Sequence, residues 1–254
     1  MYFEERGEGV PVLLIHPAGA TASTWGVVAD DLAKHARVIA YDRRGYRRSG
    51  GAPANSIPVH TSDAAALLDR LQCPPAVIVG TSIGATIAID LALRRPDLVR
   101  AVVAHESPWH VTRHPPTPSQ VGALTKMGWL AARGQHARAA EAFLRFAYTY
   151  RDGGTAWDAF PEEWRRTVGE NAEAALVDIR TAIGSYPTAK DLAAVEPRVI
   201  STYGLRSPKT MARVTRSLAA AIPTGEVLSI EGAGHAAPFD APANFVEVIA
   251  AAMS

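Results

Sequence analysis

Cysteine is almost absent from this chain of 254 residues, in which Cys73 is the only one. A single thiol excludes an internal disulfide framework and a metal site built from several cysteines. An excess of charge is also missing, because 26 basic residues stand against 25 acidic ones and the net charge is +1. Without a long-range electrostatic field, neither a nucleic acid nor an anionic membrane is favoured as a partner.

Long hydrophobic runs are missing as well. A membrane-spanning helix needs roughly 20 consecutive apolar residues, and the apolar segment 64–71 is interrupted by Asp69 and Arg70. The first eight residues include three glutamates and no apolar core of the kind that a secretory signal requires. We therefore expect no membrane partner and a cytoplasmic location.

The chain alternates short β-branched apolar runs with longer helical stretches. This pattern is typical of a mostly parallel, twisted sheet with helices on both faces, which is an α/β fold. Strands are expected at residues 10–16, 37–42, 75–81, 100–106, 198–204 and 226–232. Helices are expected at about residues 22–35, 57–72, 83–95, 207–221 and 241–253.

One interval breaks this alternation, because about 90 residues between Glu106 and Arg198 contain no convincing strand. Two amphipathic stretches, 139–150 and 174–183, indicate helices within it. We predict a helical cap of residues 107–190, inserted after the strand that ends at Glu106 and lying over the carboxyl ends of the strands. The remaining residues, 1–106 and 191–254, are expected to form the core.

The predicted cap holds ten of the 18 aromatic residues of the chain. Most of them are expected to attach the cap to the sheet. Some are expected to line a pocket between cap and core, where small molecules usually bind. The candidates for substrate binding are Trp109, Trp129, Trp157, Trp164 and Tyr186.

Residues 80–84, Gly-Thr-Ser-Ile-Gly, join a predicted strand to an apolar helix. In this context the G-x-S-x-G pattern predicts a sharp, strained turn that projects the serine above the sheet, while the glycines let strand and helix approach. Ser82 would stand at the amino end of the helix, where developing negative charge is favoured. We predict that Ser82 is a nucleophile. The alternative is that a serine between glycines forms a plain turn.

With this motif the chain resembles an α/β-hydrolase over essentially its full length. Segment 13–25 resembles the His-Gly-x oxyanion loop of that family, with Pro17 where glycine is commoner. Segment 41–50 resembles the Asp-x-Arg-Gly-x-Gly-x-Ser loop. The resemblance implies that the backbone N–H groups of Ala18 and Ile83 form the oxyanion hole, and a proline at 17 leaves the N–H of Ala18 free.

The second loop departs from the family pattern at Arg47, where glycine is usual. Its four arginines are assigned to a hydrogen-bonded turn and a solvated face rather than to a phosphate site. These arginines are Arg43, Arg44, Arg47 and Arg48.

His235 lies in a loop of small residues between the last expected strand and the final helix. This resembles the Gly-x-Gly-His loop of the family, so we predict that His235 is the general base. Two other histidines compete with it. His16 is expected to be a structural hydrogen-bonding residue of the oxyanion loop, and strand alternation is expected to turn His105 away from its neighbour Glu106.

The acid of the triad is not where most family members have it. An aspartate usually follows the strand after the cap, in a Gly-x-x-Asp arrangement, but no Asp or Glu occurs from Leu205 through Gly225. Glu106 ends the preceding strand of the expected sheet and could hold the imidazole equally well. Haloalkane dehalogenases and the zearalenone-lactonase group place their acid there, and the chain resembles the latter group. We predict that Glu106 is the acid.

Two aspartates remain as weaker candidates for the acid. Asp42 is expected to hold the turn of its loop, and Asp240 comes only after His235. The turn without an aspartate is assigned a packing role, in which Ser207 and Pro208 start the next helix as its cap and its first residue.

The predicted reaction is the hydrolysis of an ester or lactone of an apolar or aromatic small molecule through an acyl-enzyme, with no metal and no cofactor. Two alternatives stay open. One is cleavage of a carbon–carbon bond next to a ketone with the same Ser82, His235 and Glu106. The other is a non-catalytic small-molecule receptor on the same scaffold.

Overall fold

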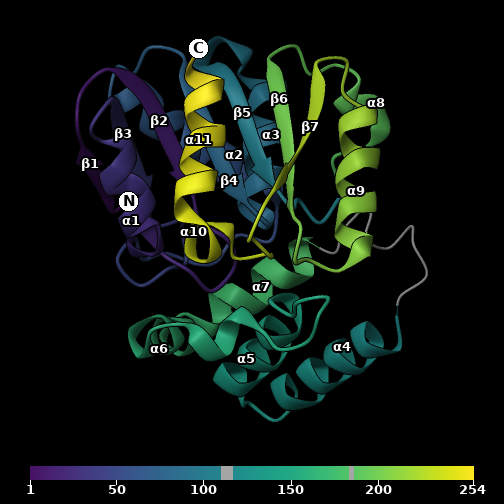
Figure 1. Cartoon of the computed structure of the whole chain (residues 1–254). Helices are drawn as coiled ribbons and strands as arrows, with labels where there is room; N and C mark the ends of the chain where they lie inside the picture. Colours follow the sequence, from purple (N-terminus) through teal and green to yellow (C-terminus); the bar gives the residue numbers. More distant parts are fainter. Residues whose placement is uncertain (110–116, 183–185) are drawn as a thin grey trace.

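A computed structural model describes residues 1–109, 117–182 and 186–254 of the chain. Its seven-stranded sheet has the order β1-β3-β2-β4-β5-β6-β7, and every neighbouring pair is parallel except β1 with β3 (Figure 1). The strands are β1 Phe3–Arg6, β2 Val10–Ile15, β3 Ala36–Tyr41, β4 Ala76–Thr81, β5 Val99–His105, β6 Arg198–Gly204 and β7 Gly225–Ile230. The six expected strands are therefore confirmed, with ends within two residues.

Strand β1 was not predicted from the sequence. It is short and carries Glu4, Glu5 and Arg6, a composition that does not stand out as a strand. It pairs antiparallel with β3 at the edge of the sheet. Charged side chains are common on edge strands because they discourage pairing with other chains.

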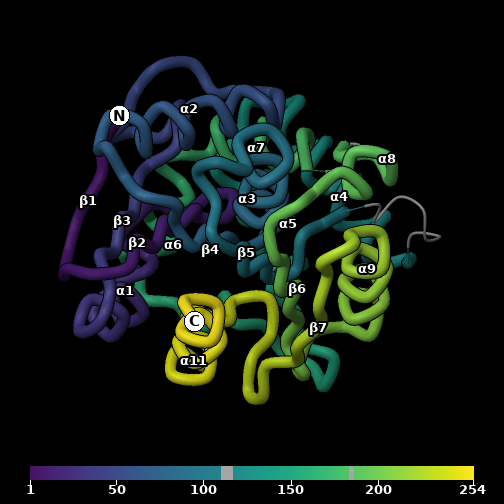
Figure 2. The backbone as a smooth tube through the Cα atoms, turned by 90° about the horizontal axis from the view of Figure 1, so that it is seen from above, coloured from purple at the N-terminus to yellow at the C-terminus, as the bar shows by residue number. Residues whose placement is uncertain are grey.

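Helices cover both faces of the sheet, as Figure 2 shows from above. Alternation along β2 explains the two layers, because successive side chains of a strand point to opposite faces. Leu13 and Ile15 belong to the larger core, with residues of α2, α3 and α9, whereas Val12 and Leu14 pack in the other core with α1 and α11. These helices are α1 Gly26–Leu32, α2 Ile57–Arg70, α3 Ile83–Arg94, α9 Lys209–Ala220 and α11 Pro242–Met253, with the short α10 Ala237–Asp240, η1 Ala22–Trp25 and η2 Pro96–Leu98.

The segment between β5 and β6 is helical where it is described. The helices are α4 Pro118–Ala131, α5 His136–Ala147, η4 Ala156–Ala159, α6 Glu162–Glu170, α7 Ala172–Ala182 and α8 Ala189–Leu192. Helices α4 to α7 gather beyond the carboxyl ends of the strands, at the lower end of the sheet in Figure 1, whereas α8 lies at the upper right beside α9. Within residues 117–182 and 186–190, no strand is formed, and one isolated bridge joins Thr149 to Thr155. The division into a core and a separate cap stays a prediction.

Helix α9 begins one residue later than expected. Pro208 has φ −53° and ψ 142°, which keeps it out of the helix and places it in the N-cap position, where its side chain cannot form a cap. Ser207 is buried and is not the helix cap. The expected helix positions of Ser207 and Pro208 are therefore wrong, whereas the burial of Ser207 agrees with a packing role for the turn. Across the described ranges, no helix is both long and apolar enough to cross a membrane.

Candidate active site

Ser82 stands at a sharp turn between β4 and α3. Its φ of +54° lies in the left-handed region, which is strained for any residue other than glycine. A Cβ on Gly80 would meet the carbonyl oxygen of Gly84 at 2.1 Å, and a Cβ on Gly84 would meet that of Ile15 at 2.2 Å. Both glycines are therefore required for the close approach of β4, α3 and β2, as the motif predicts.

The side chain of Ser82 is half-buried. Its backbone N–H donates to the carbonyl of His105 (2.9 Å), which fixes the turn to the neighbouring strand. Its hydroxyl forms no hydrogen bond with any residue that the structure describes, His235 included. Hydrogen bonds between a nucleophile and its base often tighten only when a substrate is bound.

His235 and Glu106 are in direct contact. Nδ1 of His235 donates to Oε2 of Glu106 (2.7 Å), and the other carboxylate oxygen accepts the backbone N–H of Gly204 (2.9 Å). Gly204 ends β6, the strand after which the expected aspartate is missing. Glu106 has φ +46°, so its side chain leaves the regular alternation of β5 and reaches the histidine loop.

The Glu106 side chain is fully buried, whereas the His235 side chain is 12% exposed. Burial alone would raise the pKa of this carboxyl. The hydrogen bond from His235 and the charges of His105 and His235 outweigh burial and lower the pKa to about 2, from an ordinary value of 4.5. Glu106 is therefore ionised at neutral pH. Its contribution to stability is present above pH 4.5 and is lost as the pH falls towards 2.

The two rival histidines, His16 and His105, are both buried, and both ring nitrogens of each form hydrogen bonds. Nε2 of His16 accepts the N–H of Arg43 (3.0 Å) and Nδ1 donates to the carbonyl of Pro17 (2.8 Å), so the ring is neutral. Burial and the charge of Arg43 lower the pKa of His16 well below its ordinary value. His105 bonds the side chain of Thr202 (2.9 Å) through Nδ1 and a loop carbonyl (3.1 Å) through Nε2. Neither ring has a nitrogen available to a substrate.

The two rival aspartates hold loops. Asp42 accepts the N–H of Ala22 (2.8 Å) and two bonds from Arg48 (2.5 and 2.7 Å), as expected for a turn-holding residue. Asp240 accepts the N–H of Gly234 (2.8 Å) and the hydroxyl of Tyr150 (2.6 Å).

Gly234, the residue before His235, is fixed on both sides. Asp240 accepts its N–H, and Nε2 of His105 donates to its carbonyl (3.1 Å). A Cβ at this position would lie 2.8 Å from the ring of Tyr150. The loop that carries His235 is therefore held by the core and by the segment between α5 and η4.

The two expected oxyanion donors are unpaired. The N–H of Ala18 follows β2, and the N–H of Ile83 is the first of α3. Neither group donates to an acceptor in the described parts of the chain. Unpaired N–H groups at the start of a helix and in an adjacent loop suit an acceptor that carries negative charge.

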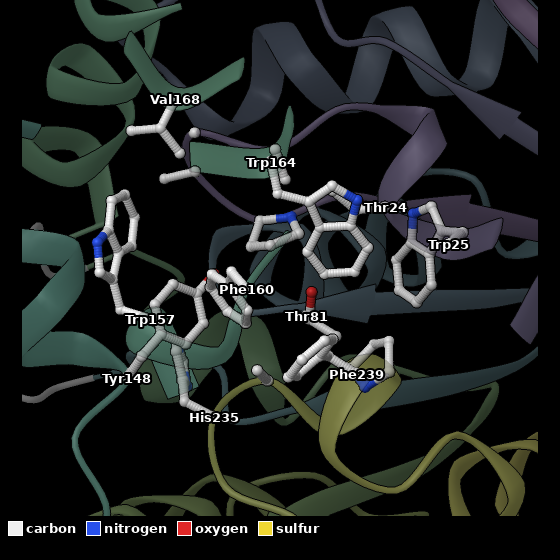
Figure 3. Close-up of a pocket in the computed structure, with 16 residues that line it drawn as sticks. Thr24, Trp25, Thr81, Tyr148, Trp157, Phe160, Trp164, Val168, His235 and Phe239 are labelled. Atoms are coloured by element: carbon white, nitrogen blue, oxygen red, sulfur yellow. The ribbon is translucent and has the colours of Figure 1, made fainter. Parts of the chain in front are cut away.

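A pocket of about 540 Å³ of empty volume, partly open to solvent, has Ala18, His235 and Thr81, the residue before Ser82, in its wall. Figure 3 shows the pocket with Thr81 and His235. Among the residues that line it, most are aromatic or small and apolar, and none is an Asp, Glu, Lys or Arg. The lining residues are Pro17, Ala18, Gly19, Ala20, Thr24, Trp25, Thr81, Tyr148, Trp157, Phe160, Trp164, Val168, His235, Ala236, Pro238 and Phe239.

The structure places two of the five predicted aromatic residues, Trp157 and Trp164, on this pocket. Three further aromatic residues line the pocket and were not predicted from the sequence, namely Tyr148 and Phe160 of the inserted segment and Phe239 of α10. Phe239 touches both Phe160 (ring centroids 5.0 Å apart) and Trp164 (5.5 Å). Its position four residues after His235 is the signal that could have identified it.

The other three predicted aromatic residues lie away from the pocket, which corrects the expectation for them. Trp109 is buried and donates its indole N–H to a backbone carbonyl (2.6 Å). Trp129 is 54% exposed on α4, with the guanidinium of Arg133 3.7 Å from its ring centroid. Tyr186 donates its hydroxyl to the carboxylate of Asp90.

The expectation of a solvated face is wrong for Arg43. Its side chain is 0% exposed and forms two bonds to Asp178 of α7, Nη1 to Oδ1 (3.0 Å) and Nη2 to Oδ2 (2.6 Å). The charge of Arg43 and the hydrogen bonds from His60 and Arg43 outweigh burial and hold the pKa of Asp178 well below its ordinary value. Arg44 and Arg47 do lie at the surface.

Comparison with known proteins gives both fragmentary and full-length matches. The uncharacterized hydrolase YraK of Bacillus subtilis is 37% identical over 109 residues, which are 42% of this chain and 40% of that protein. An epoxide hydrolase of Caballeronia sordidicola is 42% identical over 118 residues, 44% of this chain and 35% of the relative. The solved enol-lactonase of Burkholderia xenovorans LB400 shares the fold, with a TM-score of 0.80 at 19% identity over 99% of this chain and 95% of that chain.

The alignments thus span two fifths or less of the two curated relatives. The resemblance to the zearalenone-lactonase group stays a prediction. In the described residues, no group of three or more His, Cys, Asp or Glu side chains could hold a metal ion. Residues 12–248, nearly the whole chain, match the model of the alpha/beta hydrolase family. The fold, the turn at Ser82 and this match together show that the chain belongs to the alpha/beta hydrolase family.

Proposed function

We propose that the protein is a serine hydrolase that cleaves a carboxylic ester or lactone of a neutral, apolar small molecule. The observation that carries this proposal is the bond between His235 Nδ1 and the buried, ionised carboxylate of Glu106. A carboxylate on Nδ1 fixes the tautomer in which Nε2 can accept a proton. Nε2 has no hydrogen-bond partner in the part of the chain that the structure describes, so it is free to accept a proton.

In the proposed reaction, Ser82 Oγ attacks the carbonyl carbon while His235 Nε2 takes its proton. Glu106 stabilises the imidazolium that forms. The N–H groups of Ala18 and Ile83 donate to the tetrahedral oxyanion. Collapse expels the alcohol, which receives the proton from His235, and the same imidazole then activates a water molecule that releases the acid.

The pocket supports an apolar substrate. Its wall offers aromatic rings and no arginine or lysine that would pair with a phosphate or carboxylate. Aromatic side chains supply large apolar contact areas to a neutral ligand. Tyr148, Trp157, Phe160 and Trp164 all come from the inserted segment, and we propose that residues 107–190 act as a cap that selects the substrate.

Epoxide opening is not proposed, although one relative is an epoxide hydrolase. Attack by Ser82 on an epoxide carbon would form an ether. An ether has no carbonyl for water to attack, so the enzyme would not be regenerated.

A substrate panel tests the proposal. Purified protein is incubated with aryl esters of increasing acyl length, macrocyclic lactones and β-diketones, and with a serine-reactive fluorophosphonate probe. We expect turnover of esters or lactones and labelling of the protein. Turnover of diketones alone would instead indicate carbon–carbon cleavage, and tight binding without turnover or labelling would indicate a receptor.

The pocket wall makes a prediction about specificity. Replacing Trp164 with alanine removes an apolar contact surface, so we expect kcat/KM for a bulky aryl ester to fall about tenfold or more, because contacts of this size discriminate by that amount. For a short acetate ester we expect a smaller loss. Steady-state kinetics with both esters measures the difference.

The matched control is Trp129→Ala, which removes the same side chain from the exposed face of α4. It is expected to leave both kcat/KM values within about twofold, as surface substitutions usually have small effects. Equal losses in the two variants would contradict the assignment of Trp164 to the substrate pocket.

A further inference from the structure

The Ala18 N–H shares a peptide group with the carbonyl of Pro17. Because a peptide group is planar, the orientation of its carbonyl fixes the orientation of its N–H. The proposed oxyanion donor is therefore directed by whatever holds Pro17 O. A donor to that carbonyl also polarises the group and strengthens the N–H as a donor.

In the described residues, three groups hold Pro17 O. They are Nδ1 of His16 (2.8 Å), Nη2 of Arg43 (3.3 Å) and the N–H of Ala20 (3.4 Å). Arg43 is the only charged donor among them. It comes from the loop after β3, so the oxyanion loop is held from outside its own segment.

The next residue of the loop is held by the same cluster. The N–H of Gly19 donates to the hydroxyl of Tyr46 (2.9 Å), and that hydroxyl donates to Oδ2 of Asp178 (2.6 Å). Asp178 also receives both bonds from Arg43. The Asp178 carboxylate on α7 of the inserted segment thus fixes Arg43 and Tyr46. These two side chains hold the peptide groups before and after Ala18.

All three side chains of the Arg43–Tyr46–Asp178 cluster are buried, and none lines the pocket. A buried ion pair is weak evidence for stability, because apolar residues of similar volume often stabilise a protein as well or better. A role in orienting the oxyanion loop would explain why the charged pair of Arg43 and Asp178 is buried at this place.

We propose that Arg43, Tyr46 and Asp178 are positioning residues that aim the Ala18 N–H at the oxyanion. They act through the Pro17 and Gly19 peptides and do not touch the substrate. This inference rests on the proposed serine hydrolase function. It adds that the inserted segment contributes to transition-state stabilisation through Asp178, and not only to the pocket wall.

The decisive variant is Tyr46→Phe, which removes one hydroxyl and keeps the ring. Because complete loss of an oxyanion donor costs about 10²- to 10³-fold in kcat, we expect a misaligned donor to cost on the order of tenfold or more. The loss should fall on kcat, with KM little changed, as for an interaction made only in the transition state. Affinity for a trifluoromethyl ketone analogue, which forms the oxyanion, should fall by a similar factor.

Tyr41→Phe is the matched control. Tyr41 is a fully buried tyrosine of the adjacent strand β3, and its hydroxyl has no hydrogen-bond partner in the described part of the structure. This variant is expected to keep kcat and analogue affinity within about twofold of the wild type. Thermal unfolding of both variants checks that the fold is intact.

A second variant removes both charges at once, Arg43→Met with Asp178→Leu, so that no buried charge is left unpaired. We expect it to show the same selective loss of kcat and analogue affinity. Folded Tyr46→Phe with wild-type kcat and analogue affinity would overturn the inference and leave the proposed function intact. A wild-type protein that neither turns over esters nor binds the analogue would overturn the proposed function itself.

Discussion

Ester hydrolysis falls by about 10⁴-fold or more when Ser82 is replaced by alanine, if the proposed mechanism holds, because loss of the nucleophile removes the acyl-enzyme route altogether. The same change removes the hydroxyl that a fluorophosphonate probe modifies. We therefore expect the wild type to be labelled and Ser82→Ala to stay unlabelled. The measurements are initial rates on the best ester of the panel and in-gel fluorescence of the probe.

Ser62→Ala serves as the control for this variant, because Ser62 is exposed on α2 and its hydroxyl, among the described residues, bonds only the backbone of its own helix. It should be labelled and active like the wild type. Equal labelling of Ser82→Ala and wild type would show that the probe reacts elsewhere and would contradict the assignment of the nucleophile.

Glu106→Ala is expected to have the second-largest effect, a loss of about 10³- to 10⁴-fold in kcat. A loss of this size is known when the acid of a triad no longer fixes the histidine tautomer. Near-ultraviolet circular dichroism should show that the tertiary structure survives. Asp42→Asn and Asp240→Asn are expected to cost less, because these carboxylates hold loops and do not touch His235. Wild-type activity in Glu106→Ala would refute the assignment of the acid.

A rescue experiment sharpens this test. The third residue after Gly204 is Ser207, the position at which most of the resembled family carries its aspartate. Gly204 already contacts Glu106 through its N–H, so the end of β6 lies beside the acid. Adding Ser207→Asp to Glu106→Ala is expected to restore part of the lost kcat. Ser207→Asn in the same background should restore none, because it supplies no charge.

Local patterns were sufficient to predict six of the seven strands and the sharp turn at Ser82. The six strands have the composition of buried strands, and the turn at Ser82 is encoded by two glycines whose role is steric. The contact of Glu106 with His235 could also be anticipated, because neighbouring parallel strands end at the same edge of a sheet. The structure brings these two residues together, and their catalytic roles remain proposals.

Long-range contacts set the limit of the sequence reasoning. Nothing in the local sequence distinguishes Arg43 from the exposed arginines of the same loop. Its burial depends on Asp178, which lies 135 residues away in the chain. The direction in which an aromatic side chain points also depends on residues that are distant in the sequence. Trp129 and Trp164 are both tryptophans on helices of the inserted segment, yet only Trp164 meets Phe239 of α10.

The backbone at Ser82 and Glu106 has a consequence for engineering. Both residues adopt left-handed φ values, +54° and +46°, which cost on the order of 1–3 kcal/mol each in residues that carry a Cβ. Glycine would adopt these angles without steric cost. A selection for heat resistance alone would therefore favour glycine at Ser82, a position that the proposed chemistry needs, whereas Glu106 also stabilises the fold through its bonds to His235 and Gly204. Programmes that seek a thermostable variant should hold both positions fixed and look for stability elsewhere in the chain.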